Sequence, residues 1–196
     1  MVAGADEAGR GSLAGPLVAA AVAFDLERIG LPERRALAWL DDSKQKTPEQ
    51  REELYPAVLR AAAGVAVAVR SVRAIDTRGL HVSNLEALGD SLRAVSRPGA
   101  VCLTDGFRVP GLEFAHQAVI GGDSRSAAIA AASVIAKVTR DRYMRRAEQL
   151  YPGWNFAGNA GYSTPDHRAA IAERGVCPLH RMSFASVAYT QLDLGA

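Results

Sequence analysis

Apolar stretches alternate with amphipathic segments along this chain. Residues 17–24 are apolar nearly throughout, which is typical of a central strand covered on both faces. Shorter apolar runs predict four further strands, over residues 2–6, 65–72, 101–104 and 115–120. Helical patterns separate several of these strands. The alternation favours the α/β class, with a mixed central β-sheet flanked by helices.

Helices are expected at four places. Thr47 followed by Pro48 is a typical helix start, and leucines at 85, 88 and 92 give residues 83–95 one apolar face. Residues 124–150 form the longest helical pattern, and residues 165–173 a shorter one. Alanines dominate the first half of the long helix, so we expect it to be buried. Its second half carries five basic residues: Lys137, Arg140, Arg142, Arg145 and Arg146. The four arginines are candidate contacts to a nucleic-acid backbone, although such a run is more often a solvated face.

Length and composition narrow the class of protein. A chain of 196 residues fits one domain over 1–196, with about 187–196 expected as a flexible tail. Its 48% hydrophobic and 22% charged residues exclude disordered and fibrous proteins. The longest apolar run is too short to span a bilayer, so no membrane partner is expected. The two cysteines, Cys102 and Cys177, suggest neither a disulfide scaffold nor a metal pair, and we expect a cytoplasmic protein.

Acidic residues at strand ends are the candidate catalytic and metal-binding groups. Asp6 and Glu7 close the first predicted strand, Asp105 closes the fourth, and Asp123 follows the fifth. If these strands are neighbours, four carboxylates meet at one sheet edge and stay ionised only with bound cations or by sharing protons. Mg²⁺ or Mn²⁺ suits such oxygen ligands, and two such ions can hydrolyse a phosphodiester.

A simpler interpretation remains open for each of these acids. A single Asp at a strand–helix junction is more often a helix cap, and Asp123 is placed for that role. Adjacent strand residues also point to opposite faces of a sheet. Asp6 and Glu7 therefore share a site only if the strand ends there, which Gly9 favours.

Seven motifs together resemble bacterial ribonuclease HII. They occur in family order and cover residues 2 to about 187: DEAGRGSLAGP at 6–16, DSK at 42–44, TDG at 104–106, GGDSRSAAIAAASVIAKVTRDRYM at 121–144, YPGWNF at 151–156, GYST at 161–164 and PLHRMSF at 178–184. One such motif would be weak evidence, whereas the ordered set is specific.

The resemblance implies a ribonuclease H-like α/β fold with a helical C-terminal part. It implies a metal-dependent endoribonuclease that hydrolyses the RNA strand of RNA–DNA hybrids. It also implies nicking 5′ of single ribonucleotides in duplex DNA, which leaves 3′-hydroxyl and 5′-phosphate ends and begins ribonucleotide removal. The cofactors would be two divalent ions, Mn²⁺ or Mg²⁺.

The resemblance also assigns residues. Asp6, Glu7, Asp105 and Asp123 match the metal-binding acids. Our own hypothesis is that Asp6 and Asp105, with Asp123 nearby, hold the ion that activates water, and that Glu7 shares the ion at the leaving oxygen. Gly9, Arg10 and Gly11 match the loop that reads the ribose 2′-hydroxyl, the group that separates RNA from DNA. Tyr162 matches the tyrosine packed on the sugar beside the junction, although a partly buried core tyrosine is the simpler interpretation from sequence alone.

Other positions carry weaker expectations. Lys44 and Lys137 are candidate phosphate contacts, although a solvated lysine is an equal alternative for Lys44. Three residues depart from the family pattern: Ser12 in place of proline, Ser163 in place of glycine, and Arg125 in place of lysine. Arg181 and Ser183 match a family motif, but their sequence context gives neither a role.

Three competing functions can be tested. Ribonuclease HIII shares the fold and the substrate but has an extra N-terminal domain, whereas the first catalytic strand here begins at residue 2. A non-catalytic hybrid-binding module would not need four acids, and a small-nucleotide phosphatase is weaker still. We expect a monomer. The tail residues Gln191, Leu192, Asp193 and Leu194 resemble a sliding-clamp-binding peptide, but a disordered end is the favoured interpretation.

The net charge of +2 is small for a nucleic-acid binder. With the four site acids set aside, 17 acids face 23 bases, and the rest of the chain carries +6. The modest net charge is therefore compatible with a nucleic-acid substrate.

Overall fold

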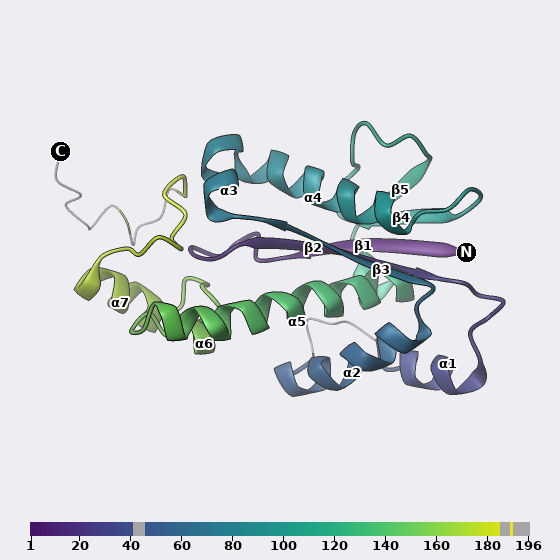
Figure 1. Ribbon diagram of the computed structural model, residues 1–196, viewed down its shortest axis with the longest axis horizontal. Helices are drawn as coiled ribbons and strands as arrows, with labels where there is room; N and C mark the ends of the chain where they lie inside the picture. The colour runs from purple at the N-terminus through teal and green to yellow at the C-terminus, as the bar shows by residue number, and fades with distance from the viewer. Residues whose placement is uncertain (41–45, 185–188, 190–196) are drawn as a thin grey trace.

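Five strands form one mixed β-sheet in the order β3-β2-β1-β4-β5 (Figure 1). The computed structural model describes residues 1–40, 46–184 and 189 of the chain. β1 pairs antiparallel with β2 and parallel with β4, β2 pairs antiparallel with β3, and β4 pairs parallel with β5. This confirms the predicted mixed sheet, and the strand bounds are β1 Val2–Ala8, β2 Leu17–Phe24, β3 Gly64–Arg70, β4 Val101–Asp105 and β5 His116–Val119.

β2 is buried along its whole length, as its apolar sequence predicts. Its residues alternate between two cores: Val18, Ala20 and Val22 pack with the long helix α5 (Ala127–Leu150), while Leu17 and Ala19 pack with residues of α4 (Leu80–Val95). Side chains of successive strand residues point to opposite faces, so a strand covered on both sides has no polar position.

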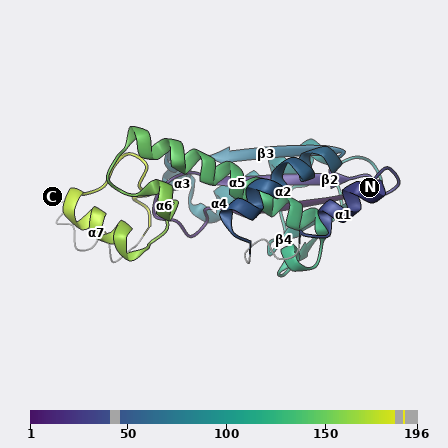
Figure 2. The ribbon, with the colours of Figure 1, turned by 90° about the horizontal axis from the view of Figure 1, so that it is seen from below.

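Helices cover both faces of the sheet and continue beyond one end of it. In Figure 1, α3 and α4 lie on one face, and α1, α2 and α5 lie on the other. Figure 2 shows α6 and α7 beside the far end of α5 rather than over the sheet, which is the expected helical C-terminal part. The remaining helix bounds are α1 Leu31–Leu37, α2 Pro48–Ala61, α3 Val72–Arg78, α6 Phe156–Asn159 and α7 Pro165–Arg174.

The Ala-rich half of α5 packs directly on β1. A Cβ placed on Gly4 of β1 would overlap the backbone of Ala128 and Ile129. Ala128, Ala130, Ala131 and Ala132 are all buried in the same core. The expected burial of the Ala-rich half is confirmed, and its small side chains let the helix approach the sheet closely.

Several predicted boundaries shift. β1 continues to Ala8 rather than ending at residue 6, because its pairing with β2 extends to Ala8 and Val18. The predicted strand 65–72 ends at Arg70, since the Ser71 hydroxyl caps α3. Thr47 caps α2 in a capping box with Gln50, as expected from Thr47 and Pro48. The short helices α1, α3 and α6 have no counterpart among the predictions.

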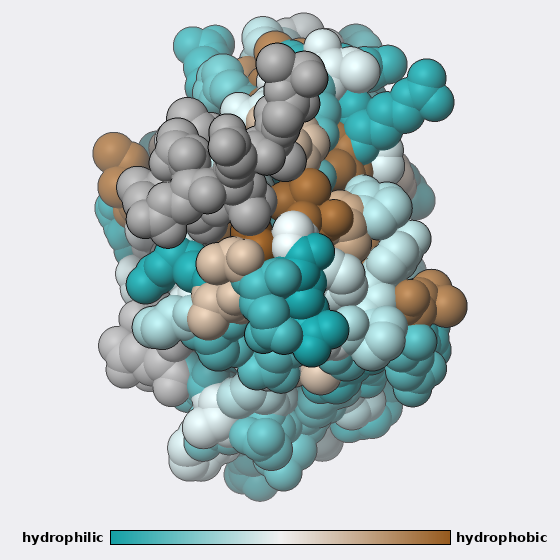
Figure 3. Space-filling model, turned by 90° about the vertical axis from the view of Figure 1, so that its left-hand side faces the viewer, coloured by the Kyte–Doolittle hydropathy of each residue, from teal (hydrophilic) through white to brown (hydrophobic). Residues whose placement is uncertain are grey.

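No helix in the described part of the chain is both long and apolar enough to cross a membrane. Figure 3 views the end of the molecule drawn on the left of Figure 1, and its described surface is largely hydrophilic around a small hydrophobic patch. Cys102 and Cys177 are buried and free.

Candidate active site

Three neighbouring parallel strands bring the acidic residues to one sheet edge. Ala5 of β1 pairs in register with Thr104 of β4, so the next residues, Asp6 and Asp105, lie side by side. β5 adjoins β4 and leads to the 3₁₀ turn η1 (Gly122–Ser124), which carries Asp123. The predicted convergence of the strand ends is therefore confirmed.

Asp6 and Glu7 point to opposite faces of β1. We expected the two acids to share a site only if the strand ended there. The strand instead continues to Ala8. Asp6 hydrogen bonds with Ser133 of α5, whereas Glu7 lies toward Asn84 of α4. Both acids nevertheless line one groove, because pairing between β1 and β4 stops at Ala5 and leaves that edge of β1 open beyond it.

Asp105 and Asp123 are held by the turn that follows β5. The amide of Gly122 donates a 2.7 Å hydrogen bond to Oδ1 of Asp105, which ties the end of β4 to η1. Asp123 is 5% exposed. The N-cap residue of α5 is Ser126, so the alternative that Asp123 caps the long helix is wrong.

The carboxyl groups raise one another's proton affinity. Burial raises the pKa of Asp6 to about 7, the charges of Asp105 and Asp123 add to the rise, and the hydrogen bond with Ser133 opposes it. Burial and the charge of Asp6 raise the pKa of Glu7 to about 7 as well. At neutral pH the groove therefore holds carboxyl groups that ionise fully only with a cation nearby.

The chemistry of these ligands fits divalent cations. Oε2 of Glu7 is buried and accepts no hydrogen bond in the described part of the chain, so a buried oxygen lacks a partner. Hard ions such as Mg²⁺ and Mn²⁺ take oxygen ligands of this kind. Over residues 1–40, 46–184 and 189, however, no three His, Cys, Asp or Glu side chains are already gathered around one ion position. The groove therefore suits a divalent ion because of its oxygen ligands and excess negative charge, and not because of a preformed coordination site.

The groove has a volume of about 580 Å³ and collects most of the predicted site. Of ten predicted residues it is lined by eight: Asp6, Glu7, Asp105, Gly9, Arg10, Gly11, Lys137 and Tyr162. Asp123 lies beside this lining, close enough for its charge to act on Asp6. Lys44 and the tail residues 191–194 lie outside the described residues.

The loop at Gly9–Gly11 is fixed against an aromatic ring and a buried arginine. Gly9 has a φ of 87°, a backbone conformation that favours glycine, and this turns the chain out of β1. The Arg10 guanidinium lies 4.4 Å from the ring centre of Phe107, a cation–π contact. Nη1 of Arg181 donates to the carbonyl of Arg10 at 3.2 Å. Arg181, for which the sequence predicts no role, is buried and thus fixes the loop backbone through this hydrogen bond.

Tyr162 lines the groove beside basic groups rather than lying in the core. Its ring centre lies 5.4 Å from Nζ of Lys137 and 5.3 Å from the Arg140 guanidinium. Its carbonyl accepts a 2.9 Å hydrogen bond from Nδ1 of the buried His167. Nζ of Lys137 also donates to Asp141 at 2.7 Å, so this lysine is held between the ring and a carboxylate.

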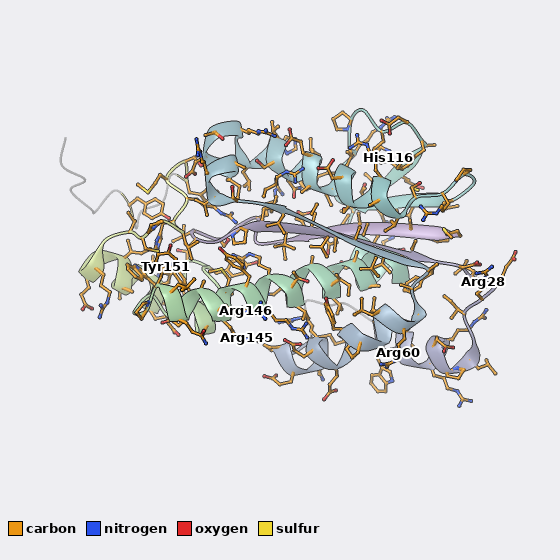
Figure 4. The ribbon with its side chains drawn as sticks, viewed as in Figure 1. Arg28, Arg60, His116, Arg145, Arg146 and Tyr151 are labelled. Carbon is orange, nitrogen blue, oxygen red and sulfur yellow. The ribbon has the colours of Figure 1, made fainter. Side chains whose placement is uncertain are left out.

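The predicted basic run on α5 does not form one binding face. Arg140 is fully buried and donates into the protein. Arg142 and Arg145 both pair with Glu52 of α2, with shortest N–O distances of 2.5 and 2.6 Å. Arg145 and Arg146 lie on the outer side of α5, away from the sheet (Figure 4). The helix turns these residues in different directions because they are not all three or four positions apart.

Two basic residues of the groove were not predicted. Lys46 and Arg51 line it together with the acids. Arg51 lies one turn inside α2 and is held by the Lys46 carbonyl and by Asp141 of α5. Neither forms a motif with the acids along the chain. Only the packing of α2 against α5 brings them to the groove.

Comparisons with known proteins show which family this chain resembles. The family model described as Ribonuclease HII matches residues 3–187. A ribonuclease HII of Rhodococcus erythropolis is 48% identical over 186 residues, which cover 95% of this chain and 80% of that protein. The ribonuclease H2 structure from Pyrococcus horikoshii has a TM-score of 0.82 at 28% identity, covering 97% of this chain and 96% of that one. A ribonuclease HII from Archaeoglobus fulgidus, solved in complex with PCNA, has a TM-score of 0.77 at 28% identity, covering 93% and 92%.

Proposed function

Because the chain belongs to the ribonuclease HII family, whose members are type 2 ribonucleases H acting on RNA–DNA hybrids, we propose that it also nicks duplex DNA 5′ of a single embedded ribonucleotide. The products are a 3′-hydroxyl and a 5′-phosphate, and the reaction begins the removal of ribonucleotides from DNA. The substrate is an RNA–DNA hybrid or a DNA duplex that contains ribonucleotides.

One observation carries the proposal: acids, a glycine loop and a tyrosine line the same groove. The acids suit phosphodiester hydrolysis. The Gly9–Gly11 loop offers backbone groups small enough to approach a 2′-hydroxyl, which both donates and accepts hydrogen bonds. The ring of Tyr162 offers an apolar surface that suits a deoxyribose and that a 2′-hydroxyl would crowd. Together these parts distinguish a ribonucleotide followed by DNA.

Asp6, Glu7, Asp105 and Asp123 are the residues that would hold two divalent ions, either Mg²⁺ or Mn²⁺. Such ions supply an activated water and stabilise the leaving 3′-oxygen of a phosphodiester. Asp6 lies toward Ser133 of α5 and Glu7 toward Asn84 of α4, which favours their serving different ions.

Basic side chains around the acids bind the phosphate backbone. Lys137, Lys46 and Arg51 line the groove, and their positive charge offsets the repulsion between phosphates and carboxylates. Lys137 is oriented by Asp141, so its ammonium group is held in place before substrate arrives. All these residues come from one chain, which is consistent with a monomeric enzyme.

Asp105→Asn tests the proposal because it removes one charge and keeps the shape of the side chain. The amide oxygen can still accept the hydrogen bond from Gly122, so the turn that carries Asp123 stays in place. We expect cleavage of a duplex with one ribonucleotide to fall by at least ~10³-fold.

Duplex binding by Asp105→Asn should remain within about threefold of wild type, because the basic residues that contact phosphates are unchanged. Cleavage by gel assay and affinity by fluorescence anisotropy measure the two effects. Cleavage by the variant at the wild-type rate would contradict the assignment, and binding without cleavage by the wild type would favour a hybrid-binding module.

A further inference from the structure

Ser12 follows the Gly9–Gly11 loop and is fully buried. Its hydroxyl donates a 2.9 Å hydrogen bond to the carbonyl of Gly9 and accepts one of 2.7 Å from Nη2 of Arg140. A hydroxyl both donates and accepts, so this one side chain connects the loop backbone to the guanidinium. Proline, the residue usual at this position in the family pattern, has no such group.

Arg140 is a rigid anchor for that hydroxyl. It is fully buried, and its planar guanidinium also donates to the carbonyls of Pro16, Ala14 and Ala160 at 2.9, 3.0 and 2.9 Å. A Cβ on Gly9 would overlap the same guanidinium, so the loop backbone lies directly against it. Four acceptors in fixed directions leave the guanidinium one orientation.

Two successive peptide groups of the loop are therefore held by their carbonyls. Ser12 holds the carbonyl of Gly9, and Arg181 holds the carbonyl of Arg10. The structure has no cis peptide in its described part, and in a trans peptide the N–H points away from the carbonyl. With both carbonyls directed into the protein, the amides of Arg10 and Gly11 are directed the opposite way.

These two amides have no acceptor in the described part of the chain, and both residues line the groove. An amide donor directed into a groove is suited to an oxygen of the substrate. We propose that Ser12, anchored by Arg140, is a positioning residue that fixes the Gly9–Arg10 peptide so that the loop donors meet a ribose 2′-hydroxyl. This inference rests on the proposed function and deepens it by naming what sets the preference for a ribonucleotide.

The test compares affinity for two DNA duplexes of one sequence, one with a single ribonucleotide and one without. The ratio of their Kd values is the ribonucleotide preference. It is measured in Asp105→Asn protein, in which cleavage is blocked, with and without Ser12→Ala. We expect Ser12→Ala to lower the preference about tenfold, the factor for one well-placed hydrogen bond, while affinity for all-DNA duplex stays unchanged.

Ser91→Ala is the matched control. Ser91 is 1% exposed and its hydroxyl donates to the carbonyl of Leu88 within α4, so the variant removes a buried hydroxyl that touches no loop residue. It should keep the wild-type preference. Tm values are measured for every variant, and affinities well below the lowest Tm. If Ser12→Ala does not fold, Ser12→Cys keeps the volume with a weaker donor and should lose part of the preference.

An unchanged preference in a folded Ser12 variant would overturn the inference, as would an equal loss of affinity for both duplexes, which indicates a merely structural role. The proposed function is scored separately by cleavage with the otherwise wild-type protein. If that protein cuts the ribonucleotide duplex and the preference survives Ser12→Ala, only the inference fails. If it neither cuts nor prefers that duplex, both fail.

Discussion

The carboxyl groups of Asp6 and Glu7 have pKa values of about 7, and this makes the groove responsive to both protons and cations. Burial is the main cause for each, and neighbouring carboxylates add to it. A divalent ion reverses this effect because it favours the ionised form. If these acids bind metal as proposed, ligation would displace protons from them.

We predict that metal binding at pH 7 releases protons. Because burial and neighbouring carboxylates raise their pKa values to about 7, these carboxyl groups are partly protonated in the metal-free protein near that pH, and ligation would expel the proton. Titration calorimetry with Mn²⁺ in two buffers of different ionisation enthalpy measures the release. Apparent affinity should rise from pH 6 to pH 8, and heats that do not depend on the buffer would contradict the prediction.

The chemistry of single residues was partly predictable from the sequence. The four acids, the Gly9–Gly11 loop and Tyr162 lie in recognisable motifs. The contacts of Ser12 and Arg181 were not predictable, because they depend on the folded path of the loop. Ser12 donates to the carbonyl of Gly9, and Arg181 donates to the carbonyl of Arg10, which is far from it in sequence. Lys46 and Arg51 were missed because only the packing of α2 against α5 brings them to the groove.

Among the secondary-structure elements, α7 and the segment after it support Tyr162 through a histidine pair. The Cys177 amide donates to Nδ1 of His180, Nε2 of His180 lies 3.2 Å from Nε2 of His167, and Nδ1 of His167 donates to the Tyr162 carbonyl. This series of hydrogen bonds requires both imidazole rings to be neutral, because Nε2 of His167 must accept the hydrogen bond from Nε2 of His180. Burial and the neighbouring His167 accordingly lower the pKa of His180 to about 4.

We predict that His180→Asn reduces the loss of stability in acid. A pKa that is lower in the folded state means that the unfolded chain binds more protons between about pH 6.5 and 4, so the free energy of unfolding falls as the pH drops through this range. The contribution of His180 is on the order of 3 kcal/mol. Its full value is present above pH 6.5.

Urea unfolding of metal-free wild type and His180→Asn, from pH 7 to pH 4, measures this contribution. Asp6 and Glu7 act in the opposite direction, since their raised pKa values stabilise the folded state as the pH falls, but they are common to both proteins and cancel in the difference. The stability advantage of wild type should shrink toward pH 4. An advantage that stays constant with pH would contradict the assignment.

The contact between β1 and α5 is the packing that sets the acid-bearing strand. We predict that Gly4→Ala costs about 1–3 kcal/mol, because its Cβ would overlap the backbone of Ala128 and Ile129. Gly64→Ala on β3 is the control, since its Cβ would meet Val95 at 3.7 Å, an ordinary contact. Urea denaturation measures both, and equal stability of the two variants would contradict the packing argument.

Elements with a long, regular pattern were predicted well, as β2 and α5 show. The short helices α1, α3 and α6 were not, because four to seven residues carry too little periodicity to be distinguished from a loop. The end of β1 was placed two residues early, since Asp6 and Glu7 read as polar strand termini. Pairing with β2 carries the strand through them.

Over the whole molecule, four acids gather at one site while basic residues are in excess in the rest of the chain. The net charge is only +2, but the four site acids are buried or line the groove, and the remaining residues carry +6. Lys46, Arg51 and Lys137 place part of that excess beside the acids. On the proposed function, this distribution would attract a polyanion to a site that repels it until cations are bound, which would couple productive substrate binding to the metal.

Mapping the cleavage product is the most direct test of the proposed nicking activity. The substrate is an end-labelled DNA duplex with one ribonucleotide, incubated with Mg²⁺, Mn²⁺ or EDTA, beside an all-DNA duplex of the same sequence. We predict a single nick immediately 5′ of the ribonucleotide with either metal, a 3′-hydroxyl and a 5′-phosphate at the nick, and no cut with EDTA or in all-DNA duplex. Cleavage in EDTA, cleavage of the all-DNA duplex, or tight binding with no cleavage in either metal would contradict it.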